Sequence, residues 1–372
     1  MRFIPWRLGL AILLCVLTLC GCQGSVSLYA DTVFTGMDTA ITLRLPADTD
    51  KTLLHDATTS VEALVAELEK SLSCHDTGSE LYALNQAPQR YHTRDTTLGA
   101  VLHTALSMAS LTDGAYDPTM GQLTDLWNVA HGGPKPKDAA IAEALTHCGW
   151  EKVSVDQTAS SQTASSLTTV DQTASSLTTD SCIVTKEDPL LQLDLGGIGK
   201  GYGLQSAVTL LADMGIDYGL VSFGGNIGVF GEKPDGTPFQ IGVKDPHDTS
   251  AIVGYLYIQN GFVSVSGDYE RFFRQDGVIY HHILDPETGY PADSGLSSVV
   301  VYAQNGAAAD ALSTALFVLG IEDGMALYQS ASATSLSFEA LFITADDRIL
   351  ATPGMEELFD KTAKAYTLET KE

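Results

Sequence analysis

The chain is poor in basic residues, which number 20 against 46 acidic ones, so its formal net charge is −26. Charged residues of both signs make up only 18% of its 372 residues. A surface this negative repels nucleic-acid phosphates and anionic lipid head groups. The composition therefore excludes a basic DNA- or RNA-binding protein, and we expect no nucleic-acid partner.

Cysteines are also few. The sequence has six, of which three lie beyond residue 22, at Cys74, Cys148 and Cys182. An odd number of thiols cannot pair completely. None of the three has another Cys or a His at the spacing of a metal motif. We therefore interpret these cysteines as incidental to function.

The N-terminus has an apolar run, but one too short for a comfortable transmembrane helix. Two arginines precede Leu8–Leu19, the order found in signal peptides. Gly21 then stands before Cys22, which resembles a bacterial lipobox. We predict a signal peptide over 1–21 and a lipidated Cys22 that anchors an extracytoplasmic protein to a bacterial membrane without a span. The alternative is an ordinary secretory peptide with chance cysteines.

Two further stretches lack the composition of a packed domain. We predict a short tether over residues 22–32. Residues 156–180 form an insertion of small polar residues. Within the insertion, a ten-residue unit that begins at Gln162 is repeated from Gln172. Such a composition cannot bury a core, so we interpret the insertion as a disordered surface loop, with a binding loop as the alternative. We expect 33–372 to form one globular unit around it.

The periodicity of the remaining sequence predicts mixed secondary structure. Apolar residues three and four positions apart predict helices over 53–72 and 97–112, and further helices are expected after Gly201 and over 306–319, stopped by Gly320. Strand-forming residues predict strands at 190–195, 218–223, 239–244, 252–259, 262–266, 278–284, 297–303, 338–343 and 347–351. Short turns between them favour an α+β fold with mixed or antiparallel sheets and packed helices over a doubly wound parallel sheet.

A glycine-rich run, DLGGIGKGYG, covers residues 194–203. Glycines let backbone amides approach a phosphate, a following helix N-terminus favours anions, and Lys200 adds a full positive charge. The run is not a P-loop, because Asp194 stands at the first glycine position, and Leu204 breaks a dinucleotide-binding pattern. A tight strand-to-helix turn is the alternative interpretation.

Asp310 and Thr314 are four residues apart in a predicted helix, so their side chains are neighbours on one face. A carboxylate beside a hydroxyl suits a hard cation such as Mg²⁺. The alternative is an acidic residue near a helix N-terminus with a Thr bonded back to its own helix.

Two adjacent histidines, His281 and His282, lie in a predicted strand and therefore point to opposite faces. One of them could face a cleft and exchange protons near neutral pH. The alternative is an exposed strand end with one histidine satisfied in the core.

Read together, these pieces and several weaker turns resemble the FAD:protein FMN transferase family, which is also called ApbE or thiamine-biosynthesis lipoproteins. The resemblance runs from about Phe34 to the end of the chain and excludes the insertion. Its landmarks appear in order: Met37–Thr39, Ser79–Asn85, Gly114–Thr119, Asp194–Lys200, Gly224–Asn226, Ser266–Glu270, His282–Pro286 with Thr288 and Gly289, and Ala309–Thr314.

The resemblance implies a T-fold-related α+β fold with FAD in a cleft between sub-domains. It implies FAD contacts at Met37, His75, Ala115, Tyr116, Asp117, Asp194, Lys200 and Ile283. It also implies Mg²⁺ ligands at Asp310, Thr314 and the backbone carbonyl of Gly197, and a role for His282 in transfer. The chain departs from the family in two places, because Asp38 stands where a glycine is frequent and His75 where an aromatic residue is frequent.

The implied activity is transfer of the FMN half of FAD to a Thr or Ser hydroxyl of a target protein, with release of AMP. Mg²⁺, Lys200 and backbone amides would neutralise the diphosphate, and His282 would take the proton of the hydroxyl. The implied partners are FAD and FMN-carrying acceptor proteins, above all subunits of membrane redox complexes. Two alternatives remain open: an Mg²⁺-dependent pyrophosphatase that releases FMN and AMP, and a non-catalytic flavin-binding lipoprotein.

Overall fold

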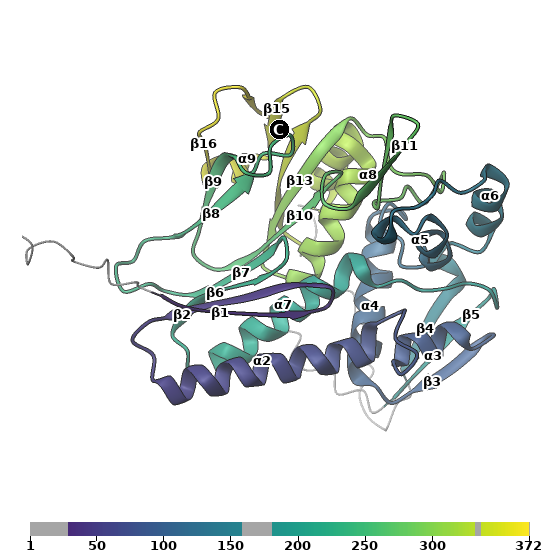
Figure 1. Ribbon diagram of the computed structural model, residues 1–372, viewed down its shortest axis with the longest axis horizontal. Helices are drawn as coiled ribbons and strands as arrows, with labels where there is room; N and C mark the ends of the chain where they lie inside the picture. The colour runs from purple at the N-terminus through teal and green to yellow at the C-terminus, as the bar shows by residue number, and fades with distance from the viewer. Residues whose placement is uncertain (1–28, 158–180, 332–335, 372) are drawn as a thin grey trace, which may run out of the picture.

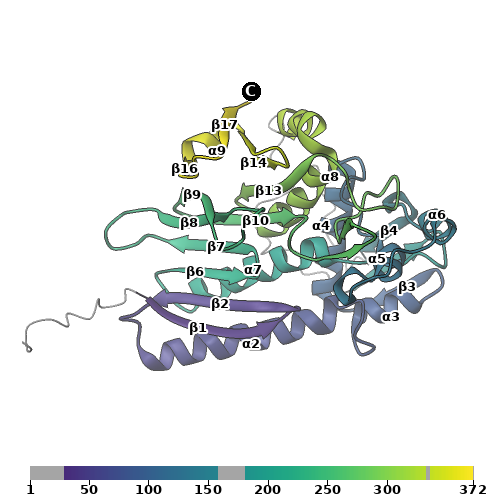
Figure 2. The same ribbon diagram turned by 45° about the horizontal axis from the view of Figure 1, so that its top comes forward.

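The computed structural model describes residues 29–157, 181–331 and 336–371. The predicted signal peptide, Cys22 and residues 158–180 of the predicted insertion lie outside the described residues. The centre of the fold is one large sheet, and Figure 2 shows its strands following one another from β1 near the bottom to β17 near the top. Its nine strands are, in spatial order, β1 (Tyr29–Gly36), β2 (Thr39–Pro46), β6 (Tyr218–Phe223), β7 (Asn226–Gly231), β10 (Gly261–Gly267), β13 (Leu296–Ala303), β14 (Phe338–Thr344), β15 (Arg348–Ala351) and β17 (Thr367–Thr370).

Neighbouring strands of this sheet are antiparallel, except that β15 and β17 run parallel. The central strand β13 is apolar along nearly its whole length because both of its faces are covered. Val299 and Val301 face one core cluster and Val300 faces another. The sheet is therefore the middle layer of the molecule.

Three long helices cover one face of the sheet: α2 (Lys51–Leu72), α7 (Gly196–Asp213) and α8 (Gly306–Ala331). Alone among the described helices, α8 is long and apolar enough to cross a membrane by length and composition. Its extensive packing on α7, β10 and β13 accounts for that apolar character, because a helix buried on most sides needs few polar residues. We interpret α8 as a core helix.

The other face of the sheet is covered by a smaller sheet of β16 (Phe359–Lys361), β9 (Ile252–Ile258) and β8 (Phe239–Lys244), with the short helix α9 (Pro353–Leu358) beside it. The α+β class and the antiparallel pairing predicted from the sequence are confirmed.

A second lobe lies at one end of the long helices (Figure 1). Its three-stranded sheet has the order β3 (Arg90–Thr93), β5 (Cys182–Lys186) and β4 (Val153–Gln157). Its helices are α3 (Glu80–Gln86), α4 (Thr96–Leu111), α5 (Gly121–Trp127) and α6 (Asp138–Thr146), with the 3₁₀ turns η1 (Val129–His131) and η2 (Trp150–Lys152). A separate hairpin of β11 (Phe272–Gln275) and β12 (Val278–His281) packs against α5 and η1 through Phe273 and Trp127.

Several boundaries differ from the sequence-based expectation. β1 begins at Tyr29, so the last four residues of the predicted tether belong to the sheet, and β4 extends two residues into the predicted insertion. β12 ends at His281 and does not reach Leu284. α8 continues past Gly320, where the backbone leaves helical geometry and kinks (φ 73°), because both helical halves bury apolar faces in one core.

The largest correction concerns residues 190–203. The predicted strand at 190–195 is only an isolated bridge between Gln192 and Met120, and the helix begins at Gly196 instead of after Gly201. The glycines therefore lie inside the first turns of α7. Tertiary packing overrides their low helix propensity there, as the contacts of Gly201 show below.

Candidate active site

The site is organised by a close crossing of α7 and α8. A Cβ atom on Gly201 would lie 2.2 Å from the Gly306 carbonyl oxygen, and one on Gly306 would lie 2.6 Å from the Gly201 carbonyl oxygen. Only glycine permits this approach of two helix backbones. The crossing brings Asp310, on the second turn of α8, against the backbone of α7.

Asp310 is 5% exposed and receives hydrogen bonds from three elements. One carboxylate oxygen accepts from the Gly201 amide (2.8 Å). The other accepts from Asn226 Nδ2 (2.8 Å) and, at 3.4 Å, from the hydroxyl of Ser264. The buried Asp310 carboxylate is therefore surrounded by neutral donors. Burying a negative charge in this way is costly unless a cation also binds it.

Thr314, one helical turn beyond Asp310, stands between Ser266 and the start of α7. Its hydroxyl oxygen is 3.4 Å from Ser266 Oγ and 3.6 Å from where a Cβ on Gly197 would lie. The predicted trio of Asp310, Thr314 and Gly197 is thus brought together at the α7–α8 crossing. Within the described residues, no group of three His, Cys, Asp or Glu side chains gathers to hold a metal, so a cation here would have one carboxylate and neutral oxygens.

Two buried oxygen atoms beside this trio have no hydrogen-bond partner, Asn226 Oδ1 and the hydroxyl of Tyr116. Burial, followed by the charges of Asp310, Asp194 and Asp117, raises the pKa of Tyr116 well above its usual range. Unpaired buried oxygens near a carboxylate are costly. The donor set fits a small, hard cation, which prefers oxygen ligands.

The N-terminus of α7 presents a second feature of the site. Asp194 Oδ1 accepts a hydrogen bond from the Gly196 amide (2.8 Å), and the Lys200 ammonium donates to the Gly196 carbonyl (3.1 Å). The amides of a first helical turn have no intrahelical partner and attract anions. In α7, however, the Gly196 amide is taken by Asp194 and the Ile198 amide donates to the Leu195 carbonyl (3.1 Å). Lys200 is therefore the main positive group that this turn offers to a diphosphate.

Met37 reaches this region from a tight turn. Met37 and Asp38 join β1 to β2 and both have positive φ (50° and 56°), the geometry of a two-residue hairpin turn. The Met37 side chain lies against α7, where its sulfur would be 3.2 Å from a Cβ on Gly203. Asp tolerates positive φ better than most residues, which explains how this chain replaces the glycine frequent in the family.

His75 lies after α2 and is exposed, with Nδ1 3.7 Å from Asp125 Oδ1. The loop 115–117 lies closer to the α7 start, because Tyr116 contacts Gly197. Asp117 is engaged internally, since it accepts from the Thr119 amide (2.7 Å) and hydroxyl (2.6 Å) and from the Trp150 amide (3.2 Å). The Asp117 side chain therefore orients the loop 115–117. Ala115 is buried within the same loop.

His282 directly follows β12. Its backbone amide donates to the Arg271 carbonyl (3.1 Å), and its ring Nδ1 lies 3.3 Å from the same oxygen. A carbonyl only accepts, so we assign the proton to Nδ1 and the lone pair to Nε2. Burial, followed by the positive charges of Lys200 and Arg271, lowers the pKa of His282 to about 3. The ring is therefore neutral at physiological pH.

His281 has a different environment. It is buried, its Nε2 donates to the Ala292 carbonyl (3.0 Å), and its ring packs edge-on against Phe317. The core position that the alternative interpretation gave to one histidine of the pair is therefore found at His281. Ile283 is buried as well, and its carbonyl accepts from the Ala292 amide (3.0 Å).

Sequence reasoning missed several polar residues around Asp310. Asn226 and Glu270 stood within the recognised landmarks but received no role, and Ser264 had no signal at all. Burial raises the pKa of Glu270, and the charges of Lys200 and Arg271 oppose that rise. Glu270 thus lies in electrostatic reach of both Lys200 and, more weakly, Asp310.

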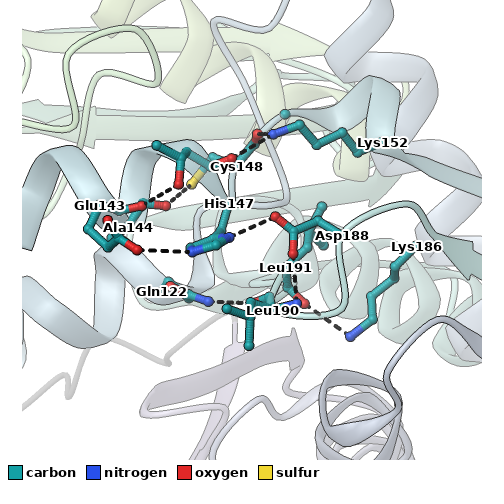
Figure 3. A network of polar contacts seen from close by, with 12 residues as sticks. Gln122, Glu143, Ala144, His147, Cys148, Lys152, Lys186, Asp188, Leu190 and Leu191 are labelled. Carbon is teal, nitrogen blue, oxygen red and sulfur yellow. Dashed lines mark hydrogen bonds and ion pairs between the residues drawn. The ribbon is translucent and has the colours of Figure 1, made fainter.

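A polar network holds the segment that leads into Asp194 (Figure 3). Lys186 is 1% exposed and donates to the carbonyls of Asn85 (3.1 Å) and Leu191 (3.0 Å). The Asn85 amide exchanges two 2.8 Å hydrogen bonds with the backbone of Leu193. On the other side His147 Nδ1 contacts Asp188 at 2.7 Å. The network therefore fixes the backbone of residues 188–193, just before α7 begins at Gly196.

Comparisons with known proteins point to one family. The sequence model of the ApbE family matches residues 37–338. The FAD:protein FMN transferase of Treponema pallidum is 34% identical over 98% of both chains, and that of Klebsiella pneumoniae is 31% identical over 78% of this chain and 83% of its own. Among solved structures, the ApbE protein of Thermotoga maritima has a TM-score of 0.74 at 29% identity, covering 89% of this chain and 99% of its own. The flavinyl transferase ApbE of Pseudomonas stutzeri has a TM-score of 0.73 at 26% identity, covering 90% and 98%.

Proposed function

This chain belongs to the ApbE family, and from that membership we propose how its own residues move the FMN half of FAD to a target protein. The reaction is FMN transfer from FAD to protein, as in its named relatives. The single observation that carries the mechanism is that Lys200, in the first turns of α7, lies in electrostatic reach of His282. These groups are the ones that phosphoryl transfer to a hydroxyl requires.

The first step is binding and orientation of FAD. The Lys200 ammonium holds the diphosphate at the N-terminus of α7, whose dipole also favours an anion. Met37, His75, Ile283 and the loop 115–117 line the flavin and nucleotide parts of the site. Asp194 stabilises the first turn by accepting from Gly196.

The second step is transfer to a Thr or Ser hydroxyl of the target. Its oxygen attacks the phosphorus on the FMN side, the new O–P bond forms, and the bond between that phosphorus and the bridging oxygen breaks. AMP leaves, and the hydroxyl proton passes to Nε2 of His282. The negative diphosphate also opposes the Lys200 and Arg271 charges that lower the pKa of His282, so substrate binding strengthens this base.

We propose that Asp310, Thr314 and the Gly197 carbonyl hold Mg²⁺, with Asn226 Oδ1 and Tyr116 as neighbouring oxygens. When bound, the ion supplies charge neutralisation beside the diphosphate.

Asp310→Asn tests this assignment, because it keeps the shape of the side chain and removes its charge. We expect Mg²⁺ to raise the melting temperature of the wild type and not of the variant, and AMP release by the variant to lose its Mg²⁺ dependence. An equal thermal shift in both proteins would overturn the site.

The transfer itself is tested by incubating the full-length protein with FAD, Mg²⁺ and candidate acceptor proteins. Acceptor mass and free AMP are then measured in the same reaction. We expect AMP and modified acceptor in equal amounts. AMP and free FMN without modified acceptor would favour the pyrophosphatase alternative, and bound FAD without AMP would favour a flavin-binding protein.

We further propose that Cys22 carries lipid and holds the domain on the extracytoplasmic side of a bacterial membrane, where subunits of membrane redox complexes are its acceptors. The lipobox pattern before Cys22 supports this proposal. Cys22→Ser should abolish metabolic labelling with a fatty acid and release the protein from the membrane fraction. Retained labelling would contradict the anchor.

A further inference from the structure

Apolar surface is concentrated beside His282. The described residues include five exposed large hydrophobic side chains, and three of them, Phe272 (40%), Val278 (50%) and Ile279 (44%), lie on the β11–β12 hairpin. The other two lie apart from the hairpin, Val33 on β1 and Leu190 in the loop between β5 and α7. Grouped exposed apolar side chains on a soluble domain mark an interaction surface, whereas scattered ones do not.

The hairpin has one packed face and one open face. Phe273 and Tyr280 stack on each other and lie in the apolar cluster with Trp127. Phe272 and Arg274 alternate with Phe273, and Arg274 pairs across the ribbon with Ile279, so these three share the opposite face. His281, the partner of Phe272, lies on the same face and is buried against Phe317, so this face is open only from Phe272 toward the turn. Val278, the partner of Gln275, lies on the packed side and is exposed next to the turn. We call Phe272, Arg274 and Ile279 the hairpin outer face. It is rigid, because Asp276 and Gly277 form a two-residue turn with positive φ at both positions.

The hairpin outer face is continuous with the catalytic histidine. The Arg271 carbonyl, one residue before Phe272, accepts from the backbone of His282 and lies 3.3 Å from its ring nitrogen. Within the described chain β11 and β12 pair only with each other, so neither strand has a second neighbour. Such a ribbon can receive an extended segment of another protein.

The charge of this face is opposite to that of the molecule. The chain has a net charge of −26, yet Arg271 and Arg274 stand here, and neither forms a salt bridge with any described residue. The Arg274 guanidinium lies 5.6 Å from the centre of the Phe272 ring. An apolar surface edged by unpaired arginines fits a segment with both apolar and acidic side chains.

We propose that the hairpin outer face docks the acceptor segment and presents its hydroxyl to His282; this inference rests on the transfer function proposed above. The segment is extended and has an acidic residue near its Thr or Ser. A strand advances about 3.3 Å per residue, so Ile279 and His282 are roughly 10 Å apart along the hairpin. The segment therefore carries an apolar side chain about three residues from its hydroxyl.

The test uses 15-residue peptides with one central Thr and Leu three residues from it on both sides. One peptide has Asp residues in its flanks, and a matched peptide has Lys residues. FMN attachment and AMP release are followed with the full-length protein at saturating FAD. We expect the wild type to modify the Asp peptide at least tenfold more efficiently, a factor that corresponds to about 1.4 kcal/mol.

Two variants then probe the hairpin outer face. Phe272→Ser with Ile279→Ser should raise the KM for the Asp peptide about tenfold or more and leave FAD affinity unchanged. Val33→Ser, at a more exposed apolar site on β1 (64%), should change neither. Arg274→Glu should reverse the peptide preference, and the matched Arg348→Glu should not. Peptide modification at wild-type efficiency by the hairpin variants would overturn the proposal.

A cross-linking experiment separates docking from transfer. Ile279→p-benzoylphenylalanine should cross-link to the Asp peptide on irradiation, and the same replacement at Val33 should not. Cross-linking without FMN attachment would leave docking supported and contradict the transfer function. FMN attachment without cross-linking at Ile279, or no cross-link and no modification of either peptide, would overturn docking on this hairpin.

Discussion

At the scale of single residues, two adjacent histidines have acquired different roles from their surroundings. His281 ends β12 and is buried against Phe317, whereas His282 lies past the strand end and shares its neighbourhood with Lys200 and Arg271. Because Nδ1 of His282 faces the Arg271 carbonyl, the ring presents its lone pair on Nε2. The protein thus sets both the protonation state and the tautomer of the proposed base.

His282→Ala should separate chemistry from binding. The proton that His282 accepts belongs to the acceptor hydroxyl, so FAD affinity should stay within a few-fold of the wild type. FMN transfer at saturating FAD should fall by about 10²-fold or more, the usual size of a general-base effect. Flavin fluorescence measures the binding, and acceptor mass measures the transfer.

His103→Ala, at an exposed position on α4, is the suitable control. His281→Ala is not, since it removes a buried ring that donates to Ala292. Transfer by His282→Ala at the wild-type rate would exclude His282 as the base, and Asp268 would be the next residue to test.

The lowered pKa of His282 has consequences for pH dependence. In the free protein the ring stays neutral down to about pH 3, so kcat/KM for FAD should show no bend from His282 between pH 5 and 8. Bound FAD raises the pKa, so any bend in kcat should lie at higher pH than one in kcat/KM. A bend in kcat/KM near pH 6.5 that disappears in His282→Ala would contradict the assignment.

The lowered pKa of His282 also predicts how the free energy of unfolding changes with pH. Between the unfolded pKa near 6.5 and the folded value of about 3, the unfolded chain binds a proton that the folded one does not. The contribution of His282 to stability is therefore complete above pH 6.5 and is lost as the pH falls toward 3. This contribution is measured by denaturant unfolding of the wild type and of His282→Ala at several pH values in the same range.

At the scale of elements, the crossing of α7 and α8 places the site. The crossing depends on Gly201 and Gly306, whose backbones touch. It also aligns the Asp310 carboxylate with the Gly201 amide (2.8 Å), so one glycine serves both the helix contact and the hydrogen bond. Gly199 of the same run has more room, because a Cβ there would meet only Met37 at 3.6 Å and Leu72 at 4.0 Å.

Two alanine substitutions in this run should therefore have opposite effects. Gly201→Ala forces the helices apart and should lower the free energy of unfolding by about 1–3 kcal/mol or more. Gly199→Ala meets only ordinary contacts and should be neutral or should stabilise α7 by up to about 1 kcal/mol. Chemical denaturation of both variants measures the difference. Equal stability of the two proteins would show that the helices do not touch at Gly201.

At the scale of the whole molecule, the second lobe that receives the insertion packs on the long helices through α4 and shares their core. β4 and β5 pair directly up to Gln157 and Cys182, so residues 158–180 are inserted at the open end of an antiparallel hairpin. The active-site residues lie on other elements. Function and stability should therefore depend little on the insertion.

Replacement of residues 158–180 by a short glycine-containing turn tests this expectation. Closing a shorter loop costs less entropy, so the free energy of unfolding should stay constant or rise by about 1–2 kcal/mol. FAD affinity should not change. Thermal unfolding and flavin titration are the measurements, and a loss of several kcal/mol would show that the insertion packs on the domain.

The sequence by itself determined much of the local structure. The helix predicted over 53–72 is α2 (Lys51–Leu72), because a regular apolar stripe requires one buried face. It also determined that Asp310 and Thr314 are neighbours, since a spacing of four in a helix fixes this without any tertiary contact. The ordered landmarks further identified the family.

Only the tertiary structure decided the start of α7 and the surroundings of Asp310. The glycines of residues 196–203 have low helix propensity, and they are helical because α8 packs closely against them. Asn226, Ser264 and Gly201 reach Asp310 from two strands and a helix that are between 46 and 109 residues away in the chain. Local periodicity contains no information on such contacts, because the order of strands in the sheet and the crossing of two helices determine which of these side chains meet.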